Sequence, residues 1–226
     1  IWKVNNNFIP AAYNKNTTIV RSNSFTNDWK VGASTINLGR DNVTEGSELY
    51  ADAGRILFYN DQLWVVKYNS KELIGIDKDT LVANGKTLPF DNLSTSIKDA
   101  KFNEFNNMFV IYGTDNYIYY FDTNRNLIEK TSINISGTTI HVDNNYIYVA
   151  SKTTAKQYLT TTIYSYSGEK ISSLNIGSDK IGDISTSPTD GYNIQAFTEY
   201  KGMLILVGLG WKNPMNGGQI YYLNKK

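Results

Sequence analysis

A recurring β-hairpin pattern constrains the fold of this chain more than any other feature of its sequence. Each copy consists of an aromatic residue or valine, a short segment rich in Asn, Asp, Lys or Gly, and a run of β-prone residues. The copies begin at Tyr13, Tyr59, Phe105, Val142 and Tyr200, so successive starts lie 46, 46, 37 and 58 residues apart. Because Asn, Asp and Gly tolerate the positive φ of tight turns, each copy predicts a hairpin.

Further strand patterns follow the three middle hairpins. In each case a β-prone run leads through a short polar turn into another run, as residues 117–122 lead into residues 127–130. The mean spacing, near 45 residues, fits one four-stranded β-propeller blade, and a chain of 226 residues accommodates five such units. The sequence therefore predicts an all-β fold, a five-bladed β-propeller of four-stranded antiparallel blades.

The five units use the entire chain, so we expect a single domain. The predicted blades cover residues 5–45, 46–92, 93–136, 137–177 and 178–226. The last unit ends soon after its third strand, residues 220–223, whereas a short β-prone run, residues 1–4, precedes the first hairpin. We expect this N-terminal run to complete the last blade as its outer strand, because closure would pair an edge that is otherwise open. The alternative is that residues 1–4 form an ordered tail.

Composition excludes several classes of site. The chain has no cysteine, which rules out disulfides, thiol catalysis and Cys-ligated zinc. Its 22 basic and 21 acidic residues give a net charge of +1, so the strongly basic surface of a nucleic-acid-binding protein is missing. The sequence also lacks an apolar run of membrane-spanning length, a Gly-rich phosphate loop and a calcium loop. We expect no cofactor, no metal, no nucleic-acid partner and no membrane span.

The segment Tyr-Ile-Tyr-Tyr-Phe-Asp-Thr-Asn at residues 117–124 resembles the strand-turn-strand units of β-propeller repeat families of the YVTN and NHL kind. A five-bladed ring rich in Asn and Tyr is also similar to the propeller platforms of phage tail receptor-binding proteins and to helveticin-type secreted proteins. These resemblances imply a recognition role and an extracellular, cell-surface or virion location.

Catalytic signals are sparse. The single histidine, His141, lies on a predicted inner strand without a recognisable nucleophile motif, and a structural role is favoured for it. Paired carboxylates are the enzymatic alternative, since five-bladed propellers include glycosidases with acids on their inner strands. The candidate acids are Glu48, Asp52, Asp99, Glu104, Asp183 and Glu199. The sequence favours a non-catalytic protein and predicts no catalytic residue, with a glycosidase or lyase left open.

Aromatic and amide side chains point to binding. The chain contains 17 Tyr, 4 Trp and 27 Asn residues, and aromatic faces and amides are suited to sugar rings and hydroxyls. Two insertions stand between the expected second and third strands of their units. They carry Trp211, Lys212 and Asn213 in the fifth unit, and Lys156 and Tyr158 in the fourth. We predict that these residues bind a sugar or an anionic polymer; the alternative is that Trp211 packs on the rim.

Together these patterns predict a non-catalytic recognition or adhesion module in a phage tail or in a secreted or surface protein. Its expected partner is a cell-surface glycan or an anionic wall polymer, and other subunits of an assembly are further possible partners. A purely structural propeller that spaces other chains in an assembly remains a third hypothesis.

Overall fold

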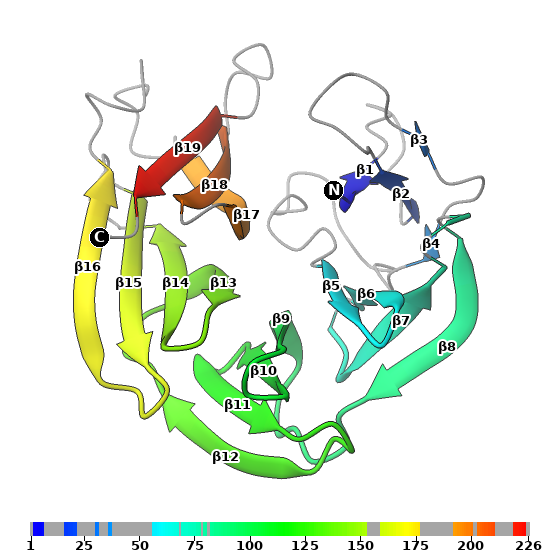
Figure 1. The fold of residues 1–226 in the computed structure, drawn as a ribbon, viewed down its shortest axis with the longest axis horizontal. Coiled ribbons are helices and arrows are strands. Elements are labelled where there is room, and N and C mark those ends of the chain that lie inside the picture. The colour runs from blue at the N-terminus through cyan, green and yellow to red at the C-terminus, as the bar shows by residue number, and fades with distance from the viewer. Residues whose placement is uncertain are drawn as a thin grey trace. The chain divides into compact units, whose positions relative to one another are not determined.

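The computed structural model describes residues 2–6, 16–21, 30–31, 36–37, 56–67, 69–77, 79–80, 82–152, 159–176, 192–200, 203–210 and 219–224. Every regular element in this part of the chain is a β-strand, and the strands form five antiparallel sheets that follow one another in sequence. Figure 1 shows these strands in chain order. The predicted all-β class is confirmed. In the described part of the chain, no helix is long and apolar enough to cross a membrane.

The chain divides into two compact units. The first unit comprises Ile1–Asp115 and Tyr119–Glu129, and the second comprises Asn116–Ile118 and Lys130–Lys226. The division passes through two neighbouring strands of one sheet, β11 (Tyr117–Phe121) and β12 (Leu127–Ser132).

The first sheet contains β1 (Trp2–Asn6), β2 (Asn16–Arg21), β3 (Lys30–Val31) and β4 (Ile36–Asn37). Strand β1 pairs with β2, with Trp2 opposite Arg21, and β19 (Gln219–Asn224) pairs with β18 (Met203–Gly210). The expectation that residues 1–4 complete the last blade is therefore wrong. Pairing with a nearby segment closes a much shorter loop than pairing with the far end of the chain, and costs less conformational entropy.

Two complete four-stranded sheets follow in chain order. Their further strands are β5 (Ile56–Tyr59), β6 (Gln62–Val66), β7 (Glu72–Ile76), β8 (Ala83–Pro89), β9 (Ile97–Asn103) and β10 (Met108–Gly113). The sheet orders are β5-β6-β7-β8 and β9-β10-β11-β12, so each strand pairs with its sequence neighbour. The predicted hairpin at Tyr59 is confirmed: Asn60 and Asp61 have φ values of 51° and 55°, as a two-residue turn between twisted strands requires.

The fourth sheet is also four-stranded, and the fifth has three strands. They are built from β13 (Gly137–Val142), β14 (Tyr146–Lys152), β15 (Leu159–Ser165), β16 (Lys170–Ile176), β17 (Tyr192–Tyr200), β18 and β19. The four-stranded pattern predicted for the three middle repeats is thus confirmed. A fourth strand is missing from the last sheet of the described residues, as the sequence indicated.

Aromatic rings make up much of the core of the first unit. Phe90 lies between Phe109 and Phe121, with ring centroids 5.3 and 5.0 Å away, and Tyr59 lies 4.4 Å from Phe102 and 4.7 Å from Phe109. The tilted and edge-on arrangements are the ones that aromatic quadrupoles favour. These contacts join strands from two consecutive sheets, so the sheets pack against each other through their aromatic side chains.

Burial falls from the middle strands to the last strand of a sheet. In β10 five of six residues are buried, whereas in β12 only Thr131 is buried, and β8 is exposed over residues 83–87. Side chains alternate between the two faces of a strand, so a strand whose consecutive residues are buried has other parts of the protein packed on both faces. The second strands are therefore enclosed, while the fourth strands face solvent.

Candidate functional site

All five residues predicted to bind ligand lie outside the described residues: Trp211, Lys212, Asn213, Lys156 and Tyr158. The strands around them are described. Residues 153–158 join β14 to β15, and residues 211–218 join β18 to β19. Both segments therefore connect the second and third strands of consecutive sheets, as the sequence predicted for these two insertions. Their role in binding stays a prediction.

Two of the six candidate acids can be located in detail. Glu104 is exposed beyond the end of β9, and Asp99 on β9 is completely buried. The Asp99 Oδ1 accepts a hydrogen bond of 2.8 Å from the Ala100 amide and lies 3.4 Å from the Lys101 Nζ. The hydrogen bond and the nearby lysine compensate the buried charge of Asp99, so a structural role explains this carboxylate. Glu48, Asp52 and Asp183 lie outside the described residues, and Glu199 is placed on β17 by its backbone.

His141 takes part in a cross-strand contact. It stands opposite Tyr148 in the pairing of β13 with β14, and the two ring centroids are 5.7 Å apart. Such directly opposed pairs stabilise antiparallel sheets. Packing against Tyr148 is therefore a sufficient structural role for His141.

Turn aspartates bond to the backbone, as the sequence suggested. The Asp77 Oδ1 accepts hydrogen bonds from the amides of Asp79 and Thr80, and the Asp143 Oδ1 accepts them from Asn145 and Tyr146. These are the bonds by which Asx turns satisfy backbone donors. Among the described residues, no group of three or more His, Asp or Glu side chains is arranged to hold a metal ion.

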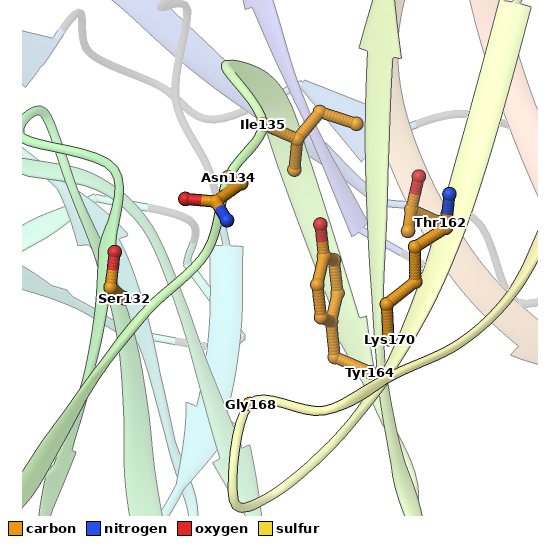
Figure 2. Close-up of a pocket in the computed structure, with 7 residues that line it drawn as sticks. All are labelled: Ser132, Asn134, Ile135, Thr162, Tyr164, Gly168 and Lys170. Carbon is orange, nitrogen blue, oxygen red and sulfur yellow. The ribbon is translucent and has the colours of Figure 1, made fainter.

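A hollow in the second unit is the candidate site that the structure does describe. Its volume is about 370 Å³, and it lies between the end of β12 with the segment that follows and the strands β15 and β16. Its lining residues are Ser132, Asn134, Ile135, Thr162, Tyr164, Gly168 and Lys170. Figure 2 shows Tyr164 standing between Asn134 on one side and Thr162 and Lys170 on the other.

The floor of the hollow is one face of β15. Thr162 and Tyr164 are two residues apart on this strand, so they project from the same face. Thr162 is 2% exposed and Tyr164 is 5% exposed, yet no described residue hydrogen-bonds either hydroxyl. Both side chains line the hollow, so a molecule inside it would meet them.

A break in the strand register brings a cation to this face. In the pairing of β15 with β16, Ile163 stands opposite Ser172, but Tyr164 stands opposite Lys170, so the register shifts by one residue between them. Without the shift, Ile171 would oppose Tyr164. Bulges of this kind re-aim side chains. The shift leaves Ile171 48% exposed and places Lys170 beside the tyrosine.

The β15–β16 turn forms one end of the hollow through Gly168. This residue has a φ of 86°, and an added Cβ would lie 2.0 Å from the Thr131 Cγ2 on β12. The backbone conformation therefore favours glycine, and the close approach requires it. The turn is held by hydrogen bonds of 3.0 Å from the Gly168 amide to the Ser165 carbonyl and of 2.9 Å from the Ser165 amide to the Glu169 carbonyl.

The hollow has a simple charge pattern. Among the lining residues that the structure describes, Lys170 is the one with a positive charge, and none is an Asp or a Glu. Burial raises the pKa of the Tyr164 phenol above its usual value of 10.0, so the hydroxyl stays protonated at neutral pH and can donate a hydrogen bond. An amide, three hydroxyls, an aromatic ring and an ammonium group thus line one space.

Sequence reasoning missed this hollow. Its signals were present, because β15 contains the run Thr160, Thr161 and Thr162 where a buried strand normally carries apolar residues, and Gly168 marks a turn. The sequence does not say that β12 approaches this turn, and the single-residue register shift that selects Lys170 over Ile171 is not visible in the strand pattern.

No protein-family model matches the sequence, and no curated protein matches it. The solved structures with similar folds include BamB from Moraxella catarrhalis, at 12% identity and a TM-score of 0.39, with 76% of this chain and 50% of BamB covered. They also include the WD40 domain of Toxoplasma gondii coronin, at 10% identity and a TM-score of 0.42, with 68% of this chain and 37% of that chain covered.

The chain therefore spans half or less of these two structures. Both are β-propeller proteins. The class defined by the strands themselves is an all-β protein of four-stranded antiparallel sheets. The resemblances to YVTN and NHL repeats, phage tail platforms and helveticin-type proteins stay predictions.

Proposed function

We propose that this chain is a single-domain, five-bladed β-propeller that acts as a non-catalytic recognition module for a cell-surface carbohydrate or wall polymer. The observation that carries the proposal is the hollow on β15, where Tyr164, Asn134 and Thr162 offer a ring, an amide and a hydroxyl. The setting we propose is extracellular, in a phage tail or in a secreted or surface protein.

Contacts within each unit support the propeller. In the first unit β1 contacts β5 and β5 contacts β9, and in the second unit β13 contacts β17. In every case the first strand of one sheet touches the first strand of the next. Blades of a propeller meet in this way, because their first strands surround the axis. The enclosed second strands and exposed fourth strands agree with the same arrangement.

The chemistry of the hollow supports carbohydrate recognition. Sugar hydroxyls both donate and accept hydrogen bonds, and the Asn134 amide and the hydroxyls of Tyr164 and Thr162 have the same double capacity. The volume of about 370 Å³ is at the lower end of the range for small-molecule sites. A short saccharide unit is the ligand class that fits these features.

The segments 153–158 and 211–218 are the second place proposed for binding. In a propeller, connections between second and third strands share one face, so Tyr158 and Trp211 would be neighbours on a rim. This proposal depends on the five-bladed ring and on the equivalent connections in consecutive sheets. The two places use different residues, and variants separate them.

A glycan and wall-polymer array tests the proposal. We expect the full chain to bind a subset of the array, and we expect Tyr164→Phe or the double variant Trp211→Ala with Tyr158→Ala to weaken binding while the thermal transition is kept. Tyr146→Phe is the matched control, because Tyr146 is an exposed tyrosine of the same unit outside the hollow. Absence of binding to every glycan and polymer would overturn the proposed function.

A further inference from the structure

The hollow on β15 contains two features that simple strand packing does not explain. Tyr164 and Thr162 are more than nine-tenths buried and aimed into it, and no described residue bonds to their hydroxyls. A buried hydroxyl needs a hydrogen-bond partner, which water or a ligand can supply. A ligand hydroxyl or oxyanion in the hollow would supply both bonds at once.

The second feature is the lysine. The register shift between Ile163 and Tyr164 exchanges an apolar side chain for Lys170 at the position opposite the tyrosine. Lys170 forms no ion pair with any described residue, and none of the described lining residues is acidic. An ammonium group has three donors and no acceptor, so it is matched by an oxyanion.

The walls of the hollow favour a sugar acid over a bare anion. On the side away from Lys170, Ser132, the Asn134 amide and the Ile135 side chain complete the lining. An amide and an apolar surface suit the hydroxyls and C–H groups of a sugar ring, and the apolar surface adds nothing to the binding of a small ion. The polarity of the hollow therefore runs from a cationic wall to a neutral one.

We infer that the hollow binds an acidic saccharide, with its carboxylate or phosphate on the Lys170 ammonium and the Tyr164 hydroxyl and its ring hydroxyls toward Asn134. The inference rests on the proposed function and narrows its ligand to one chemical class. The acid group has two natural sources, a uronic-acid carboxylate and a sugar phosphate, which share this chemistry.

The test is an NMR titration of the labelled full chain with four probes. These are methyl β-glucuronide, glucose 6-phosphate, the neutral methyl β-glucoside, and inorganic phosphate. We expect at least one of the two acidic sugars to bind about fivefold or more tightly than the glucoside and than phosphate, as one charge-assisted hydrogen bond predicts. The shifted amides should lie in β15, in β16 and at Asn134. Which acidic sugar binds identifies the source of the acid group.

Two variants assign the roles. Lys170→Gln should remove the preference for the acidic sugar, and Tyr164→Phe should weaken its binding while keeping the ring and the fold. Lys71→Gln is the matched control, because it removes the same charge from an exposed lysine of the first unit. It should leave the preference unchanged.

The remaining outcomes overturn the inference in distinguishable ways. Equal binding of the glucoside and both acidic sugars, or a preference that survives Lys170→Gln, refutes acid selection and leaves the proposed function standing. Binding of inorganic phosphate as tight as that of glucose 6-phosphate refutes a saccharide site. If no probe shifts these amides but the array still binds, ligand recognition takes place elsewhere on the chain. If neither the probes nor the array binds, the proposed function fails as well.

Discussion

Two turns of the same design occupy different surroundings in this protein. Each joins the third strand of a sheet to the fourth, at Asp122 in one sheet and at Ser165 in the next. In both, the first residue accepts a hydrogen bond at its carbonyl from the residue three positions on, at 2.9 Å from Arg125 and at 3.0 Å from Gly168. Arg125 and Gly168 both have positive φ, 68° and 86°.

The two turns differ in what surrounds them. At Arg125 a large side chain is accepted despite the positive φ, whereas a Cβ at Gly168 would lie 2.0 Å from the Thr131 Cγ2. The local sequence thus sets the turn geometry, and packing on β12 decides which residue that geometry can hold. The turn at Gly168, which packs against Thr131 of β12, is also the turn that borders the hollow.

The largest expected effect comes from Gly168→Ala. The left-handed backbone costs about 1–2 kcal/mol for a residue with a Cβ, and the overlap with Thr131 adds about 1–3 kcal/mol. Gly85→Ala is the control, since Gly85 has a φ of 77° but nothing within 4 Å of an added Cβ. Urea denaturation should show a loss of about 3 kcal/mol at Gly168 and about 1 kcal/mol at Gly85. Equal losses would mean that the contact with Thr131 is unimportant.

A double variant isolates the steric part of this effect. Thr131→Ser removes the Cγ2 that the new Cβ would meet and keeps the hydroxyl. In the Gly168→Ala background it should recover about 1 kcal/mol or more. A purely additive result would assign the entire loss to the backbone conformation.

Ser165→Ala should have the next largest effect. The Ser165 Oγ accepts a hydrogen bond of 3.1 Å from the Glu169 amide, as the Asp122 Oδ1 accepts one of 2.8 Å from the Asn126 amide. Loss of this bond should lower the free energy of unfolding by about 1 kcal/mol. Ser165→Asp copies the other turn and should restore stability to near the wild-type value. Thermal unfolding of both variants measures how far the two turns are interchangeable.

Arg125→Gly should stabilise the protein slightly. Glycine removes the cost of a left-handed conformation, about 1–2 kcal/mol, but raises the entropy of the unfolded chain by about 0.5–1 kcal/mol. A net gain of about 0.5 kcal/mol in urea denaturation is expected, opposite in sign to the effect at Gly168. A loss of stability would show that the Arg125 side chain makes a stabilising contribution of its own.

The smallest effect concerns Asp122. Hydrogen bonds from the Asn126 side chain and then from the Asn126 amide hold the pKa of this carboxyl below its usual value of 3.8. Because the folded pKa is below the unfolded one, the contribution is fully present above about pH 4 and is lost as the pH falls through the folded pKa. NMR titration of the carboxyl carbon should give a midpoint below 3.8, and Asn126→Ala should raise it. A midpoint at or above 3.8 would contradict these bonds.

Much of the strand pattern followed from the sequence. The Asn60–Asp61 turn, the four strands of the middle repeats and the early end of the last repeat depend on residues that are close in the chain, so their types predict them. The prediction failed at residues 1–4, where β-propensity indicates a strand but does not choose its partner. The nearby β2 was the partner, since short loops cost less entropy.

By itself the sequence determined the repeat, the hairpin turns and the all-β class, because these depend on the periodicity and φ preferences of neighbouring residues. Tertiary structure alone decided that Gly168 meets Thr131, that a one-residue shift places Lys170 opposite Tyr164, and that no described residue hydrogen-bonds the hydroxyls of Thr162 and Tyr164. Those features arise from contacts between strands of different sheets and from register, which a strand pattern of period two leaves open.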